Sequence, residues 1–122
     1  MPGKNEYIDY LLELMAPLGG ISARSMFGGH GIYKDGLMFG LVANDVLYLK
    51  TDAHNRAEFE QLGLAPFTYE IKGKPTAMSY FEAPADALEN PVAMTEWARR
   101  GFGAALRASA ARAPKRTSRK PS

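Results

Sequence analysis

A cluster of glycines between positions 28 and 36 is the stretch of this chain that most resembles a phosphate-binding loop. Gly29-x-Gly31 begins like a dinucleotide fingerprint, but Lys34 stands where a third glycine belongs. Gly31 and Gly36 have P-loop spacing, yet the next two residues are not the Lys-Ser/Thr pair that contacts phosphate and magnesium. We therefore predict no nucleotide site. We attribute the glycines to a bulge or a close backbone approach, with a ligand or protein contact at this corner as the alternative.

The chain has two histidines, His30 and His54, and no cysteine. A zinc site needs three or four ligands, and neither histidine has a second histidine or a glutamate at metal-binding spacing. We predict no metal ion and no cofactor. His54 should be solvated, whereas His30 could be a buried hydrogen-bonding residue. The lack of cysteine also excludes a disulfide framework, which fits a reducing cytosol.

Serine or carboxylate catalysis lacks its usual sequence context. Ser22, Ser25 and Ser79 do not lie in a Gly-x-Ser-x-Gly elbow. Glu70 and Glu82 could face each other across a predicted hairpin, but like charges placed in this way more often point to water. We therefore predict no catalytic residue and no enzymatic activity.

Arg24 precedes the apolar pair Met26-Phe27, and an arginine is costly to bury without a carboxylate or carbonyl partner. We expect a structural ion pair, with partner binding as the alternative. The candidate partner-binding surface consists of Arg24, Met26, Phe27, Gly28, Gly29, His30 and Gly31. If the protein binds a small ligand instead, we expect a closed pocket lined by Arg24, His30 and Tyr33 that holds an ionisable group with a shifted pKa.

Positive charge gathers at the C-terminal end of the chain. From Arg107 onward there are six Lys or Arg residues and no acid, whereas residues 1–106 have nine bases and thirteen acids and carry about −4. Because the tail has no aromatic side chain, it could add salt-dependent affinity for phosphate but no base stacking. The candidate nucleic-acid contacts are Lys72, Lys74, Lys115, Arg116, Arg119 and Lys120. For each of them, a solvated side chain without a partner is the alternative.

Two turns and an apolar run organise the elements that would position these residues. Asp35-Gly36 suits the positive φ angles of a two-residue hairpin turn, and Asn44-Asp45 reverses the chain again. Residues 37–43 form an apolar run of the length expected for a buried strand. We predict a meander of four strands that begins at residues 22–27 and ends at residues 46–50.

Helices and a second hairpin surround this meander. Helical spacing of apolar residues predicts helices over residues 5–16 and 53–62. Asn90 and Pro91 suit the start of a third helix that runs to about residue 112. Its predicted buried stripe is Met94, Trp97, Ala98, Phe102, Ala105 and Leu106, and on its outer face Glu96 should pair with Arg100. Residues 67–72 and 76–82 predict two strands joined by a turn at Gly73-Lys74.

The predicted order is α-β-β-β-β-α-β-β-α, which belongs to the α+β class: a mainly antiparallel sheet, built from a meander and a hairpin and packed by three helices. For 122 residues we expect one domain over residues 1–109 and a basic, disordered tail over residues 110–122. No apolar run approaches the length of a membrane span, so we expect a cytoplasmic protein without membrane contact.

Two groups of residues carry a resemblance to a known family. The first is Arg24, Met26-Phe27-Gly28-Gly29, Gly31, Asp35-Gly36 and Tyr48-Leu49-Lys50. The second is Phe67, Tyr69, Lys72-Gly73-Lys74-Pro75, Met78-Ser79-Tyr80 and Pro84. Together they resemble the N-terminal domain of the TfoX/Sxy competence-regulator family over roughly residues 7–106. The resemblance implies the same α+β arrangement and transcriptional control of competence genes alongside the cyclic-AMP receptor protein. The full regulators continue into a second domain, and we expect a stand-alone, short form.

From these observations we expect a non-enzymatic regulatory or interaction module, an accessory protein of competence-type transcription regulation. Its partner would be another protein such as a transcription regulator, a second copy in a homodimer, or both. An edge strand of the second hairpin could pair two copies. The alternatives are an accessory protein that binds DNA non-specifically and weakly through the tail, and a small-ligand-binding domain.

Overall fold

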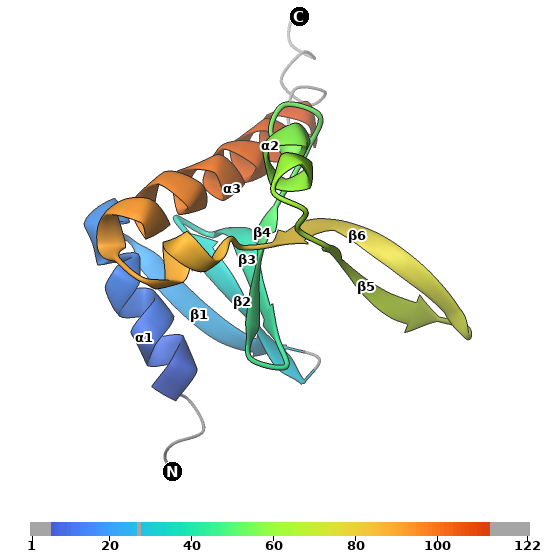
Figure 1. Cartoon of the computed structure of the whole chain (residues 1–122), viewed down its shortest axis with the longest axis horizontal. Coiled ribbons are helices and arrows are strands. Elements are labelled where there is room, and N and C mark those ends of the chain that lie inside the picture. Colours follow the sequence, from blue (N-terminus) through green and yellow to red (C-terminus); the bar gives the residue numbers. More distant parts are fainter. Residues whose placement is uncertain (1–5, 27, 113–122) are drawn as a thin grey trace, which may run out of the picture.

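The computed structural model describes residues 6–26 and 28–112, without the side chains of residues 69–71 and 75–78. The chain folds as a six-stranded antiparallel sheet with three α-helices, which confirms the predicted α+β class (Figure 1). The strands lie in the order β1-β2-β3-β4-β6-β5. The elements are α1 (Glu6–Leu14), η2 (Ala16–Leu18), β1 (Ile21–Met26), β2 (Gly29–Lys34), β3 (Leu37–Ala43), β4 (Val46–Lys50), α2 (Arg56–Gln61), β5 (Pro66–Ile71), β6 (Lys74–Glu82), η3 (Ala85–Leu88) and α3 (Pro91–Arg112).

Both predicted turns of the meander are present. Asp35 and Gly36 have φ angles of 51° and 83°, and Asn44 and Asp45 have φ angles of 52° and 61°. Two consecutive residues with positive φ match the right-handed twist of the strands that they join. These turns set β2, β3 and β4 side by side, with the apolar run of β3 buried between its neighbours.

The turn of the second hairpin was predicted one residue too late. Lys72 and Gly73 have the positive φ angles, 54° and 80°, and Lys74 already pairs with Ile71 at the start of β6. The register also contradicts the suggested pairing of two carboxylates, because Glu70 lies opposite Pro75 and Glu82 lies opposite Tyr48. The backbone register therefore does not place Glu70 and Glu82 opposite each other.

The hairpin of β5 and β6 forms an arm that projects from the rest of the molecule (Figure 1). β6 pairs with β4 at three positions only, Tyr48↔Glu82, Leu49↔Phe81 and Lys50↔Tyr80. β5 pairs with β6 alone and is an edge strand of the sheet, as expected. We use the name arm for residues 66–79.

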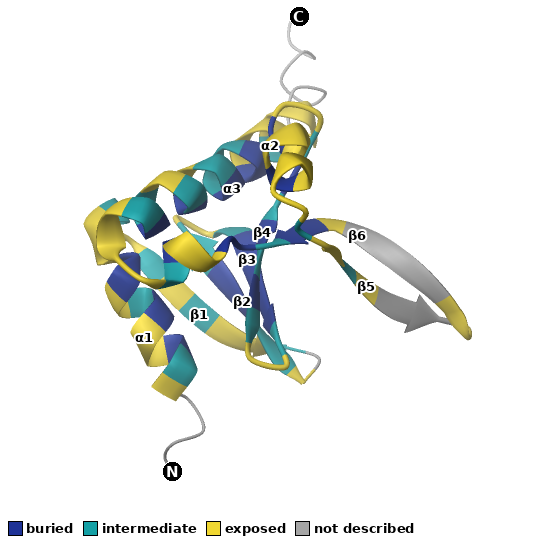
Figure 2. Ribbon diagram, viewed as in Figure 1, coloured by how far each residue is buried: buried dark blue, intermediate teal, exposed yellow. Residues whose placement is uncertain are grey.

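The helices pack on one face of the meander and enclose the core, where the buried residues gather (Figure 2). The core includes Leu11 of α1, Phe39 of β3, Leu49 of β4 and Met94 of α3. α3 comes close to β3 at Gly101, where an added Cβ would lie 3.1 Å from the carbonyl oxygen of Phe39. Within the described residues, no helix is long and apolar enough to cross a membrane.

The third helix confirms its predicted start and its predicted end near residue 112. The amide of Ala93 donates to Asn90 Oδ1 over 2.8 Å, so Asn90 caps the helix. Two expectations about its faces were wrong. Leu106 is 48 % exposed, and Arg100 pairs with Glu58 of α2 instead of with the side chain of Glu96, since α2 packs alongside.

The other helices are shorter than predicted. α1 begins at Glu6 and ends at Leu14, after which the chain continues as a 3₁₀ turn through Pro17. α2 begins at Arg56, because the three residues before it form a turn around Asp52. The cap expected from Asn5 lies outside the described residues.

Candidate functional site

The glycine corner is built by close packing, as predicted. A Cβ on Gly29 would lie 2.1 Å from the carbonyl oxygen of Val42 in β3, so only glycine fits there. A Cβ on Gly31 would lie 2.8 Å from Met26 Sδ and 3.2 Å from Met38 Sδ. Gly28 has a φ angle of 79°, which favours glycine. These glycines allow strands and side chains to approach one another, and a strand, not a helix, follows them.

Arg24 lies exposed on the edge strand β1 with its guanidinium carbon 5.0 Å from the centre of the Tyr33 ring. Among the described residues it has no ion pair, so this cation–π contact stands in place of the expected one. His30 is half-buried on β2, between Ser25 and Val42 in the register. Phe27, also assigned to the partner-binding corner, lies outside the described residues.

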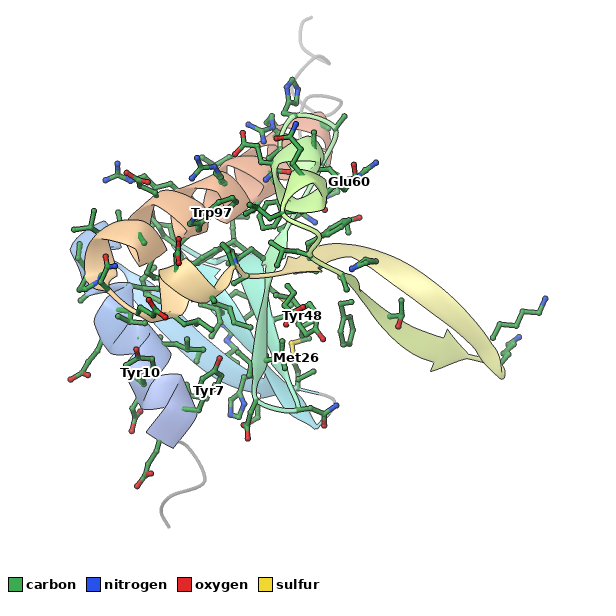
Figure 3. All side chains as sticks on the ribbon, viewed as in Figure 1. Tyr7, Tyr10, Met26, Tyr48, Glu60 and Trp97 are labelled. Carbon is green, nitrogen blue, oxygen red and sulfur yellow. The ribbon has the colours of Figure 1, made fainter. Side chains whose placement is uncertain are left out.

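One face of the sheet, which we call the open face, carries large side chains and lies opposite the helices. Its residues are the exposed Arg24 and the half-buried Met26, Tyr33, Met38, Tyr48 and Phe67. Alternation along the strands directs them away from Ala23, Ile32, Phe39 and Leu49 of the core. Figure 3 shows Met26 and Tyr48 together below the arm. The rings of Tyr48 and Phe67 lie 5.0 Å apart in an edge-to-face arrangement, so the open face continues onto the root of the arm.

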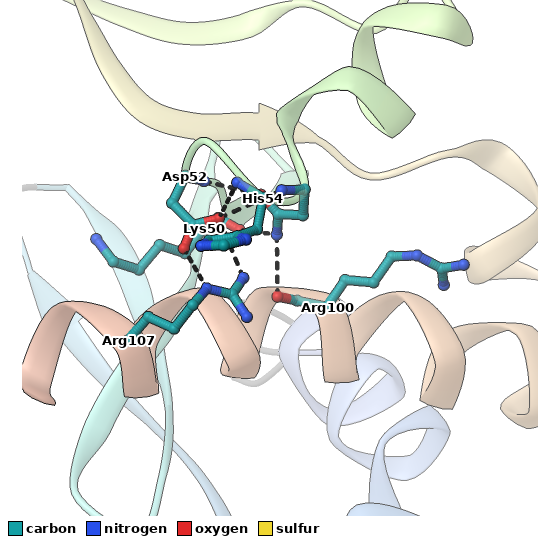
Figure 4. A network of polar contacts seen from close by, with 6 residues as sticks. Lys50, Asp52, His54, Arg100 and Arg107 are labelled. Atoms are coloured by element: carbon teal, nitrogen blue, oxygen red, sulfur yellow. Dashed lines mark hydrogen bonds and ion pairs between the residues drawn. The ribbon is translucent and has the colours of Figure 1, made fainter.

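A second surface lies where the end of β4 meets the last turns of α3 (Figure 4). Asn55 is buried and joins the two elements. Its side-chain amide donates to the carbonyl oxygens of Lys50 over 3.2 Å and of Arg100 over 3.0 Å, and its Oδ1 accepts from the amide of Asp52. The backbone amide of Thr51 donates to the carbonyl oxygen of Ser79, which adds β6 to the junction.

Asp52 and Arg107 form a bidentate ion pair across this junction. Arg107 Nε donates to Asp52 Oδ2 over 2.6 Å, and Arg107 Nη2 donates to Oδ1 over 3.0 Å. The carboxylate also accepts from the amides of His54 and Asn55. The hydrogen bond from Arg107, and secondarily those from the two amides, lower the pKa of Asp52 to about 2.

A cleft of about 400 Å³ opens beside this pair. It is lined by Lys50, Thr51, Asp52, Ala53, Arg56, Ser79, Ala104, Arg107 and Ala108. A smaller hollow of about 190 Å³ shares Lys50 and Ala108 with it and adds Leu37, Met38, Tyr80, Ala105 and Arg112, so it reaches the open face at Met38. We call the two together the basic cleft. The pocket expected at Arg24, His30 and Tyr33 is not where these cavities lie.

Two side chains in the basic cleft are buried despite their polar groups. Thr51 is 2 % exposed, and its hydroxyl has no hydrogen-bond partner among the described residues, a state that costs about 1–3 kcal/mol. Burial raises the pKa of Tyr80 to about 12, so its hydroxyl stays neutral. Lys50 Nζ lies 5.2 Å from the centre of the Tyr80 ring.

The candidate nucleic-acid residues of the sequence lie elsewhere. Lys72 and Lys74 are exposed at the tip of the arm. The four tail residues lie outside the described residues. Two of the six bases counted from Arg107 onward, Arg107 itself and Arg112, belong to α3 and line the basic cleft. Sequence reasoning missed this cleft, because its cations lie far apart along the chain, although the spacing Asp52-x-x-Asn55 is a typical turn signal.

The described residues contain no group of three or more His, Asp or Glu side chains that could hold a metal ion. The arrangement therefore offers two surfaces for contact: an apolar, tyrosine- and methionine-rich open face, and a basic cleft.

The comparisons with known proteins agree on one family. The model of the TfoX N-terminal domain matches residues 13–105, which is most of the chain. The DNA transformation protein TfoX1 of Aliivibrio fischeri is 37% identical over 65 residues, which cover 53% of this chain and 31% of that protein. The DNA transformation protein TfoX of Haemophilus influenzae is 31% identical over 87 residues, which cover 70% of this chain and 40% of that protein. The chain thus spans well under half the length of these curated relatives. On the strength of the family match, the chain belongs to the TfoX N-terminal domain family.

Proposed function

We propose that this chain is a non-enzymatic regulatory module of DNA transformation, an accessory of competence-type transcription regulation that acts by binding another protein. The names of the two relatives support the process, since both are DNA transformation proteins. The observation that carries the mode of action is the open face of the sheet, where half-buried methionine and tyrosine side chains lie beside a projecting arm.

The composition of the open face fits a protein partner. Tyrosine, methionine and arginine are enriched in protein interfaces, where aromatic rings provide large contact areas and methionine adapts to its partner. Arg24 and Tyr33 already lie against each other, so little side-chain freedom would be lost on binding. The same face would serve a second copy of the chain or a separate transcription regulator.

A chimera tests this proposal. The chimera is the Haemophilus influenzae TfoX protein in which this chain replaces the aligned 40%. It is expressed in a Haemophilus influenzae strain that lacks its own TfoX. We expect the chimera to restore transformation above the level of the deletion strain. Met26→Lys on the open face should abolish this rescue, because it places a charge in the interface.

Val92→Lys is the matched control, because Val92 is exposed on α3 and lies away from the open face. Rescue by the Met26→Lys chimera at equal protein level would contradict the open face as the interface. Failure of every soluble chimera would contradict the regulatory role.

A further inference from the structure

Charge is separated along the molecule far more strongly than the net charge of +2 suggests. α1 has three acidic residues and no basic one, and residues 83–98 have three acids and no base. Residues 99–112, the C-terminal part of α3, have four arginines and no acid. Figure 1 shows α1 near the start of α3 and α2 near its end, so the acids of α1 lie at the opposite end of α3 from its last arginines, and α2 adds Arg56, Glu58 and Glu60 beside those arginines. The count of −4 for residues 1–106 leaves out Arg107 and Arg112, which belong to the folded part of the chain.

The basic cleft lies at this end. Lys50, Arg56, Arg107 and Arg112 line it against the single carboxylate of Asp52, which leaves a net charge of +3. Arg107 is held by Asp52, but Arg56 and Arg112 are exposed and have no ion pair among the described residues. Two exposed arginines without anionic partners are available for an anion from outside the molecule.

The shape of the basic cleft favours an extended polyanion over a small phosphate ligand. It is open and divided into two hollows that meet at Lys50 and Ala108, so its cations are spread over both hollows. Arg107 lines the first hollow and Arg112 lines the second, about 7.5 Å further along the axis of α3. Its aromatic residue, Tyr80, is buried, so the cleft offers no exposed ring for base stacking. A double-stranded backbone fits these features better than a single strand.

We propose that the basic cleft binds the phosphate backbone of duplex DNA without reading its sequence. The choice of DNA over duplex RNA rests on the proposed function in DNA transformation; the cation arrangement itself does not. Arg56, Arg112 and Lys50 contact phosphates, and the Asp52–Arg107 pair fixes the geometry of the cleft.

The test is fluorescence anisotropy with a labelled DNA duplex of about 24 base pairs at about 50 and 200 mM salt. All proteins are full-length, in a background with alanine at Lys115, Arg116, Arg119 and Lys120, so that the tail does not contribute. If three cations each neutralise one phosphate, affinity falls about forty-fold between the two salt concentrations. Arg56→Ala with Arg112→Ala should reduce that fall to about four-fold.

The matched control is Arg99→Glu, which lowers the net charge by the same two units at an exposed arginine of α3 outside the basic cleft. It should bind as the parent does. Thermal unfolding checks that the double variant and the control both fold. An equal loss of binding in the double variant and in the control, a loss of binding caused by Lys72→Ala alone, no binding by the parent, or tighter binding to an RNA duplex of the same sequence would each overturn the proposal. Because purified protein is used, these outcomes do not depend on whether the chimera restores transformation.

Discussion

One carboxylate ties the loop after β4 to the last turns of α3. Asp52 accepts two hydrogen bonds from Arg107 and two from backbone amides, and its side chain is 25 % exposed. The pair holds the charged rim of the basic cleft, while Asn55 beside it satisfies backbone groups of both elements. The two residues together position β4 against α3.

Replacing Asp52 by asparagine should make stability depend less on pH. The folded-state pKa of about 2 lies below the ordinary value of 3.8, so the charged form contributes stability above about pH 4 that is lost as the pH falls towards 2. We expect Asp52→Asn to lower the free energy of unfolding by about 1 kcal/mol at pH 7, allowing for solvent screening.

Urea unfolding at pH 7, 4 and 2 measures this difference. Asparagine can still accept from the amides of His54 and Asn55, so the variant isolates the charge. Glu13→Gln, at an exposed position of α1, is the control and should show little difference at any pH. A gap between Asp52→Asn and the parent that is as large at pH 2 as at pH 7 would contradict the assignment.

The strands and helices of the meander depend on a few close approaches. Gly29 lets β2 come against β3, and Gly101 lets α3 come against β3. At both places the obstacle to a larger residue is a backbone carbonyl, which cannot move aside as a side chain can.

Alanine at Gly29 should therefore destabilise the fold by about 3 kcal/mol or more. Its neighbour Gly28 gives the matched control, because it has a positive φ but no atom within 4 Å of an added Cβ. Gly28→Ala should cost only about 1–2 kcal/mol, the penalty of the left-handed conformation. Thermal or urea unfolding of both variants measures the contrast, and equal costs would show that the approach of Val42 is not the cause.

Local signals made most elements predictable from the sequence. Asp35-Gly36 and Asn44-Asp45 specify their turns by their own φ preferences, and Asn90 caps α3 as expected. The sequence predicted the turn of the second hairpin at Gly73-Lys74, but it lies at Lys72-Gly73. A glycine flanked by two lysines allows either turn position, and only the pairing of β5 with β6 decides between them.

Features that depend on distant parts of the chain were beyond this reasoning. Helical spacing placed Leu106 in the buried stripe, but the close approach at Gly101 turns α3 so that Gly101 and Ala104 are buried and Leu106 faces solvent. The basic cleft joins Lys50 and Arg56 to residues some fifty positions later, and no local pattern connects them. The glycine corner was predicted as packing, but the open face that it supports became visible only through the strand register.

In the whole molecule, the arm has few connections to the body. The described contacts of residues 66–79 with the body are the hydrogen bond from Thr51 to Ser79 and the packing of Phe67 on Tyr48, and the two strands otherwise pair with each other. A two-stranded ribbon is marginal in water by itself, so the arm should contribute little to the stability of the body. It is available for contacts with other molecules.

A shortened arm tests this division. Thr68 and Ala77 face each other in the register, so residues 69–76 can be replaced by Asn-Gly to close a two-residue turn. We expect the free energy of unfolding to change by about 1 kcal/mol or less. Leu49→Ala in the buried body is the reference and should cost about 2–5 kcal/mol. A loss from the shortened arm as large as that from Leu49→Ala would contradict the division.

The three residue pairs between β4 and β6 have a consequence for how the two ends of the molecule act on each other. The pair of Lys50 and Tyr80 lies at the root of the arm and also lines the basic cleft. A molecule that bends the arm against the body must disturb this pair. Suppose that such a molecule changes the affinity of the basic cleft for its ligand by some factor. By thermodynamic reciprocity, a ligand in the cleft then changes the affinity of the arm for that molecule by the same factor. The Lys50–Tyr80 pair thus belongs both to the attachment of the arm and to the lining of the basic cleft.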